Sequence, residues 1–283
     1  GLLAARLNLI WLALLLVWIG LAAIGPSLTP YDPTRVNLRD SLIPPFWYDK
    51  ANPTYPLGTD TLGRDIVSRL IYGGRVSLII AVSVVIIEGT VGTAIGLTSG
   101  YYGGKLDMLF MRLTDIYIAF PGLLLALFVV AVFGAGTQNL IIALSLNGWT
   151  IFARITRGMM LSIREKEFII AARAIGCPDR RIIVRHALPN QLAVLLALVS
   201  LEVARVILSE SALSFLGLGI QPPEASWGLM VADGRTYLFK ADWVSTLPGL
   251  AIMVTVFAMT MMTQWIEAET SPTARTRKSH QPA

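Results

Sequence analysis

Few side chains of this chain are candidates for a chemical or ion-binding role, and four of these candidates are charged residues in apolar surroundings. Glu88, Glu202, Arg205 and Glu210 each lie within a long hydrophobic run. A charged side chain in such a run is costly, and in a membrane segment it marks an ion path, a relay or a buried pair. Glu202 and Arg205 are three residues apart, the spacing of neighbours on one helix face, and Ser209 continues that face. These three residues are predicted either to line a polar path or to form a buried structural pair.

Two acidic residues of these runs are predicted to be structural. Glu88 stands near Gly89, Gly92 and Gly96, and the spacing Gly92-x-x-x-Gly96 permits close approach of another helix. We expect a packing face there, with Glu88 satisfied by a neighbouring helix. Glu210 is predicted to be a helix-end or interface group and not a substrate ligand.

Hydrolytic and metal chemistry find little support in the other residue types. The chain has two histidines, His186 and His280, and a single cysteine, Cys177. One cysteine excludes an internal disulfide and a cysteine-rich zinc site. No Gly-x-Ser-x-Gly elbow occurs in the sequence, and His186 is predicted to pack within a loop. A membrane enzyme is therefore the least favoured class of protein.

The composition indicates a membrane protein. Of 283 residues, 54% are hydrophobic and 14% charged, and the mean hydropathy is +0.64. A soluble domain carries about 25% charged residues, so this chain has too little polar surface to cover itself in water. Disordered, fibrous and nucleic-acid-binding proteins are excluded despite the net charge of +5.

Six apolar stretches are expected to cross the bilayer, whose hydrocarbon core is about 30 Å thick. They are predicted at residues 7–28, 76–98, 119–133, 140–155, 192–216 and 244–266. A secretory signal peptide is the competing interpretation of the first stretch, but that run is too long for one and lacks clear cleavage chemistry. The sequence thus predicts an all-α polytopic membrane protein with six transmembrane helices.

The distribution of Lys and Arg predicts the orientation of the chain. Basic residues are concentrated between Arg154 and Arg185, and short basic loops lie in the cytoplasm. Both termini are therefore expected in the cytoplasm. The predicted parts are an anchor helix, an outer segment, a five-helix core that contains the loop 161–190, and a disordered cytoplasmic tail; their residues are 1–28, 29–74, 75–268 and 269–283.

Residues 161–190 leave the membrane without a long apolar run, and their pattern predicts two short helices joined by a tight turn. Helix formers precede Gly176, which suits a helix C-terminus. Pro178 and Asp179 suit the first turn of a second helix, and Pro189 ends it. The pair is expected to lie inside the cell.

A helical wheel divides the first of these two helices into an inner and an outer face. The face expected to rest on the protein's own spans holds Phe168, Ile169, Ala172 and Ile175. The opposite face holds Lys166, Glu167, Ile170 and Arg173. A single exposed Ile170 is ordinary for a solvated helix, but it would equally serve as a knob for a partner's groove.

Motif residues in this loop resemble a known family. The order Ala171-Ala172, three residues, Gly176, eleven residues and Leu188-Pro189 resembles the cytoplasmic "EAA" loop of permease subunits of bacterial ABC importers. The glutamate that names the motif is replaced by Ile170. The extended motif, through Asn190, is similar to the dipeptide, oligopeptide and nickel branch of these permeases.

Other matches to that branch follow in order between Leu57 and Gly249. They include Leu57-Gly-Thr-Asp-x-Leu-Gly-Arg-Asp65, Ala119-Phe-Pro121, Ser214-Phe-Leu-Gly-Leu-Gly219 and Ser226-Trp-Gly228. The chain departs from the branch at its end, where residues 261–269 replace a stretch of the type Asn-Leu-x-Gly-Asp-x-Leu-Arg-Asp.

The resemblance implies a type I ABC-importer permease of the bacterial inner membrane that forms half of a path for peptides. It implies four kinds of partner: a second homologous permease subunit, two ATP-binding subunits, a solute-binding protein outside, and the lipid bilayer. ATP and magnesium would be bound by the ATPase subunits, since this chain has no Gly-x-x-x-x-Gly-Lys-Ser/Thr loop. The sequence does not choose among dipeptides, longer peptides, nickel chelates and glutathione.

The resemblance also assigns the loop 161–190, here called the coupling loop, to a cleft of an ATPase subunit. Its expected contact residues are Glu167, Ile170, Ala171, Ala172, Arg173, Gly176, Pro178 and Asp179. The outer segments 31–74 and 220–242 are expected to meet the solute-binding protein.

A secondary carrier or channel that works without ATPase partners is the alternative function. Its ion path would contain Glu88, Glu202 and Arg205. Such a carrier would take up solute by itself along an ion gradient, whereas a permease subunit would need its ATPase partners.

Overall fold

The computed structural model describes residues 2–270, within which all regular elements are helical. One isolated bridge pairs Thr59 with Asp65 in the outer segment. The predicted all-α class is therefore confirmed. The last helix runs through Thr270, so the first two residues of the predicted tail are helical, and residues 271–283 lie outside the described part.

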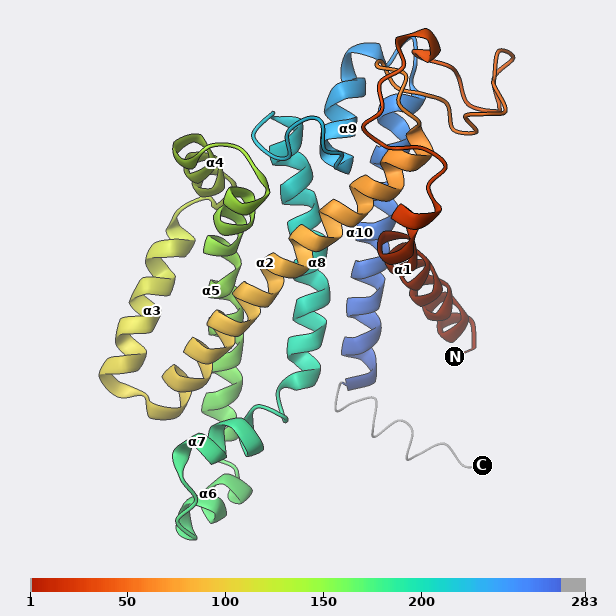
Figure 1. The fold of residues 1–283 in the computed structure, drawn as a ribbon. Helices are drawn as coiled ribbons and strands as arrows, with labels where there is room; N and C mark the ends of the chain where they lie inside the picture. The colour runs from red at the N-terminus through yellow and green to blue at the C-terminus, as the bar shows by residue number, and fades with distance from the viewer. Residues whose placement is uncertain (1, 271–283) are drawn as a thin grey trace.

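The helices follow one another in the order shown in Figure 1. The long ones are α1 (Leu2–Leu28), α2 (Ile66–Tyr102), α3 (Gly104–Ala119), α4 (Gly122–Phe133), α5 (Thr137–Ile163), α8 (Leu192–Phe215) and α10 (Trp243–Thr270). The short ones are α6 (Glu167–Ala174), α7 (Asp179–Arg181), which continues as a π-helix over Ile182–Ala187, and α9 (Trp227–Gly234).

The molecule has two distinct ends. Helices α6 and α7 lie together beyond the ends of α5 and α8, and we call this the loop end (Figure 1). The outer segment, α9 and α4 lie toward the opposite end, the cap end (Figure 1). The start of α1 and the end of α10 both point toward the loop end. This arrangement places the two ends of the described chain on the same side as the coupling loop.

Helix α2 is much longer than the predicted span 76–98. It covers 37 residues from Ile66 to Tyr102. The side chain of Asp65 accepts a hydrogen bond from the Ser68 backbone N–H at 2.8 Å and so caps the helix. The first turns carry Arg69 and Arg75, which hydropathy alone excludes from a span. The predicted outer segment 29–74 therefore ends in helix and not in loop.

The predicted third span, 119–133, contains the helix α4, and a sharp bend at its start separates α4 from α3. Helices α3 and α4 meet at a bend of 83°. Pro121 has no N–H to donate and disfavours helical backbone in the residue before it, and Phe120 is extended (φ −93°, ψ 132°). The segment 104–119, predicted to lie outside the spans, is the helix α3, which runs back from the loop end toward the cap end (Figure 1).

Length and composition identify three described helices that could each cross a membrane: α2, α8 and the 243–268 part of α10. The bent pair α3 and α4 would make a fourth. Helix α5 contains the predicted fourth span but carries Arg154 and Arg157 in its last turns. The multi-pass architecture is thus confirmed, whereas six spans stays a prediction.

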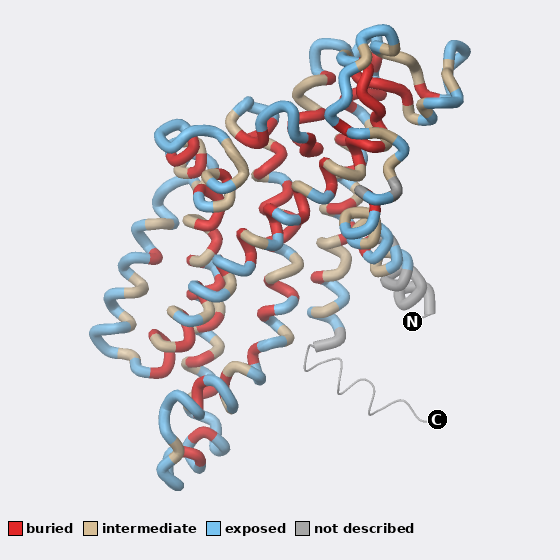
Figure 2. Tube along the Cα trace, viewed as in Figure 1, coloured by how far each residue is buried: buried red, intermediate tan, exposed pale blue. Residues whose placement is uncertain are grey.

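The core forms where α2, α5 and α8 face one another, and buried residues follow these facing sides in Figure 2. Gly92, Gly96 and Gly100 of α2 lie so close to α5 that an added Cβ would come within 3.0 Å of it. The prediction of a glycine packing face around Gly92 and Gly96 is therefore confirmed. Since the stripe recurs every four residues, α2 and α5 are joined along several turns.

Candidate coupling loop and buried polar clusters

The first helix of the coupling loop ends in the way its sequence predicts. Gly176 has a φ of +76°. Its N–H donates to the Arg173 carbonyl at 2.9 Å, and the Cys177 N–H donates to the Ala172 carbonyl at 3.0 Å. This pair of bonds is the Schellman arrangement, which needs a left-handed residue at the position of Gly176. Glycine adopts that conformation without the steric cost paid by other residues.

The predicted inner face of α6 is half right. Ile169 and Ala172 are buried, but Phe168 is 42% exposed and Ile175 is 85% exposed. The helix has eight residues and ends at Ala174, so Ile175 lies beyond the last helical turn and the wheel no longer places it. The buried stripe is therefore narrow, with one residue per turn.

Seven of the eight expected contact residues are exposed on this chain; they are Glu167, Ile170, Ala171, Arg173, Gly176, Pro178 and Asp179. Ala172 is buried against the protein's own helices, so the structure does not place it on that surface. Phe168, Ile175 and Val184 add exposed apolar side chains to the seven. We call this set the outer face of the coupling loop.

The second helix of the coupling loop is held in place by apolar side chains that are buried against other helices. Pro178 precedes the first turn as the N-cap (φ −65°, ψ 142°) and does not lie in the turn as predicted, whereas Asp179 does lie there. Ile182, Ile183 and Ala187 are buried in a cluster with residues of α2, α5 and α6. The remaining members of the cluster are Leu97, Tyr101, Met160, Ile163, Ile169 and Ala172. His186 is half-buried in this stretch, and the part of the chain that the structure describes contains no group of three or more His, Cys, Asp and Glu that could hold a metal ion.

A charged cluster joins three helices halfway along the molecule. Arg205 of α8 forms salt bridges with Glu202 of the same helix and with Glu88 of α2, the latter at 3.2 Å. Both carboxylates are at most 2% exposed, whereas the Arg205 side chain is 37% exposed. Glu202 and Arg205 are therefore in contact, as their spacing allows, and the expectation that a neighbouring helix satisfies Glu88 is confirmed. Ser209 does not join this cluster, since its hydroxyl donates to the Arg205 carbonyl at 2.9 Å.

Gly148 of α5 completes this cluster, and sequence reasoning missed it. Its backbone N–H donates to Glu88 Oε1 at 2.7 Å. A Cβ at Gly148 would lie 2.1 Å from the Glu88 carboxylate, so a larger residue would occupy the carboxylate's place. The signal was absent from the local sequence because 60 residues separate the two positions.

Glu210 is a second buried acid, and serine hydroxyls surround it. It is fully buried in α8. Ser214 donates to its carboxylate at 2.7 Å, and Ser77 of α2 donates at 3.0 Å. This geometry fits the expected interface group, because the bonds hold α8 against α2.

A third cluster closes the cap end. Arg64 donates to Asp60 at 2.6 Å and reaches Asp233 of α9 at 3.3 Å. Arg69 of α2 lies 3.4 Å from Asp60 and 3.5 Å from Asp233. Burial raises the pKa of the Asp233 carboxyl, while Arg69 and Arg64 act in the opposite direction. The motif residues between Leu57 and Asp65 thus fasten the outer segment to α2 and α9.

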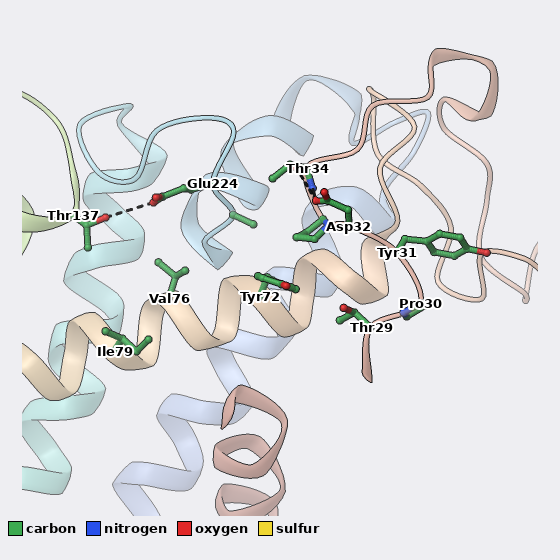
Figure 3. A pocket seen from close by; sticks show the side chains of 12 residues that line it. Thr29, Pro30, Tyr31, Asp32, Thr34, Tyr72, Val76, Ile79, Thr137 and Glu224 are labelled. Carbon is green, nitrogen blue, oxygen red and sulfur yellow. Dashed lines mark hydrogen bonds between the residues drawn. The ribbon is translucent and has the colours of Figure 1, made fainter. Parts of the chain in front are cut away.

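An open recess of about 730 Å³ lies beside this cap (Figure 3). Tyr72, Val76 and Ile79 of α2 line its floor, and Asp32 and Glu224 lie at opposite sides. Two hydrogen bonds from Thr34 lower the pKa of the Asp32 carboxyl. The recess therefore presents acidic groups on the face expected to meet the solute-binding protein.

Comparison with known proteins agrees with this architecture. Residues 92–271 match the model of the family described as "Binding-protein-dependent transport system inner membrane component". The chain is 37% identical to the dipeptide transport system permease protein DppC of Haemophilus influenzae, over 90% of this chain and 86% of that protein. It is 40% identical to the di/tripeptide permease DppC of Pseudomonas aeruginosa, over 85% and 80%. It is 35% identical to the nickel permease NikC of Escherichia coli K12, over 98% and 97%.

A solved structure shows the same fold. A chain of the MetNI methionine ABC transporter, in inward-facing conformations, superposes with a TM-score of 0.54 at 18% identity and covers 70% of this chain and 96% of that one. The family match agrees with two features of the structure, namely the buried charges that pair between helices and the anchored loop between α5 and α8. The chain belongs to the family of binding-protein-dependent transport system inner membrane components, the permease subunits of ABC importers.

Proposed function

We propose that this permease forms half of a translocation path for short peptides and is driven by two ATPase subunits that hold the coupling loop. The peptide cargo is supported by two relatives, one named for dipeptides and one for di- and tripeptides. The relative named for nickel makes a metal chelate the second candidate. A second permease subunit would supply the other half of the path, and a solute-binding protein would dock at the cap end.

The outer face of the coupling loop carries this proposal. Ile170 and Ile175 are 53% and 85% exposed, and they belong to a loop that α5 and α8 hold at both ends. Exposed apolar side chains that gather on one surface favour a partner's groove. Since ATPase subunits are cytoplasmic, the loop end and both termini are assigned to the cytoplasm. The eight Lys and Arg residues from Arg154 to Arg185 support the same orientation.

The charged cluster supports a permease over a secondary carrier. Glu88 and Glu202 are both buried and both paired with Arg205. Breaking a buried pair is costly, so these groups suit a fixed joint better than an ion path that must be vacated in each cycle. The exposed part of Arg205 leaves room for contact with a partner subunit or with cargo.

Reconstitution tests the proposed function directly. The test uses the complex of this chain with its partner permease and ATPase subunits in lipid vesicles. We expect the ATPase subunits of this complex to hydrolyse ATP faster when a peptide-loaded binding protein is added. A nickel-chelate-loaded binding protein serves as the comparison. Uptake by this chain alone, driven by an ion gradient and indifferent to ATP, would instead establish the secondary carrier.

Substitution of Ile175 by aspartate tests the outer face of the loop. We expect Ile175→Asp to weaken ATPase attachment about tenfold or more, because a charge would be buried in an apolar groove. The strength of this attachment is measured by the amount of ATPase subunits that co-purify with this chain. Leu38→Asp, at a site 68% exposed at the cap end, is the matched control and should leave co-purification unchanged. Equal recovery of ATPase with both variants would contradict the assignment.

A further inference from the structure

We propose that α2 transmits movement of the coupling loop directly to the cap end, and that Tyr101 is the positioning residue that holds the loop on α2. The inference rests on the proposed function, since ATPase subunits must move the loop. Helix α2 would be a third route for this movement, beside α5 and α8, which are connected to the loop directly along the chain.

Tyr101 lies at the loop end of α2 and contacts both short helices of the coupling loop. Its hydroxyl donates to Asp179 Oδ1 of α7 at 2.6 Å. The guanidinium of Arg173 on α6 lies over its ring, with Cζ 4.8 Å from the ring centre, which is a cation–π contact. Tyr101 itself is only 8% exposed, whereas Arg173 and Asp179 are exposed, so Tyr101 lies beneath the surface that these two residues form.

Two other contacts hold the loop to the same part of α2. Arg164, where the loop begins, donates from Nη1 to the Gly100 carbonyl at 3.1 Å. This carbonyl belongs to the last turn of α2, where helical partners are missing. Leu97 and Tyr101 also pack against Ile169 and Ile182 of the two short helices. The loop is thus fastened to α2 by cation–π, hydrogen-bond and apolar contacts together.

Helix α2 is built to move as a unit. It is one continuous helix of 37 residues, about 55 Å long at 1.5 Å per residue. Its glycine stripe holds it against α5, and Glu88 ties it to both α5 and α8. A displacement applied at Tyr101 therefore reaches the first turn of the helix with little loss to bending.

That first turn belongs to the cap cluster. Asp65 caps α2, and the Arg69 guanidinium, only 1% exposed, lies between Asp60 and Asp233. A shift of α2 must change these ionic contacts, which fasten the outer segment and α9. The cap faces the side where the solute-binding protein is expected to dock, so α2 connects the two surfaces on which partners act.

A reporter cysteine at the cap tests this route. We would place it at Leu62, which is 38% exposed and whose backbone N–H donates to Asp60 Oδ1 at 2.9 Å. Cys177→Ser serves as background, and the complete complex contains the partner permease, ATPases and binding protein. The rate of alkylation is measured from the change in mass of this chain. It is measured in two states, without nucleotide and after trapping with ATP and vanadate. We expect the alkylation rate to differ severalfold between the two states, and Tyr101→Phe to remove most of that difference.

Stimulation of ATPase activity by the loaded binding protein is the second readout. Tyr101→Phe removes the bond to a charged acceptor and is expected to lower stimulation about tenfold, with basal hydrolysis and co-purification kept. Tyr102→Phe is the matched control, because Tyr102 is 52% exposed, and it should behave as the unchanged chain. Tyr101→Leu keeps apolar bulk in the cluster but loses both contacts, so it should lose at least as much stimulation.

The outcomes separate this inference from the proposed function. A reporter difference that persists in Tyr101→Phe and Tyr101→Leu would show that Tyr101 does not hold the loop on α2 and would overturn the inference. Failure of the unchanged complex to couple hydrolysis to the binding protein would overturn the proposed function itself.

Discussion

Replacement of Gly176 by valine is expected to abolish ATP-driven uptake while membrane insertion of the chain is retained. The φ of +76° at Gly176 is left-handed, and a β-branched residue there costs about 1–2 kcal/mol or more. The strain falls on the Schellman bonds that join α6 to the turn before α7. We therefore expect the two short helices to lose their fixed angle, and the outer face of the coupling loop to lose its shape.

Transport by proteoliposomes that contain the complete complex measures this effect. Gly176→Asn should restore much of the uptake, because asparagine tolerates the left-handed conformation better than other residues. Gly158→Val is a matched control in α5, where an added Cβ meets no described atom within 4 Å. Full uptake by Gly176→Val would show that the turn geometry is not needed for coupling.

Replacement of Gly148 by alanine is expected to destabilise the assembled chain by about 3–5 kcal/mol, the cost of breaking a buried ion pair. The new Cβ would lie 2.1 Å from the Glu88 carboxylate and displace it. Glu88 would then lose the Gly148 N–H and its approach to Arg205. Because Glu88 joins α2 to α5 and to α8, both of these helix contacts would loosen.

The thermal midpoint for loss of the monodisperse complex in detergent measures this cost. Gly158→Ala in the same helix is the control and should raise or leave the midpoint unchanged, since alanine favours helix over glycine by about 1 kcal/mol. The double variant Glu88→Ala with Gly148→Ala should cost no more than Glu88→Ala alone. Additive losses would mean that Gly148 acts through some group other than Glu88.

The class of the fold and much of the coupling loop could be predicted from local sequence patterns. High hydropathy over long stretches required membrane helices, because apolar side chains without enough polar surface cannot be covered by water. The end of α6 at Gly176 and the pairing of Glu202 with Arg205 were also predictable. Each depends on residues within one turn, where the backbone geometry is known in advance.

The features that depend on how helices cross became visible only in the folded molecule. Hydropathy missed the first turns of α2, because Arg69 is buried by Asp60 and by Asp233, which is far along the chain. The helical wheel misplaced Phe168 and Ile175, since a wheel assumes a long helix and α6 is short. The hydrogen bond between Gly148 and Glu88 could not be predicted from the sequence either. Contacts between distant residues are set by the packing of whole helices, which no local pattern records.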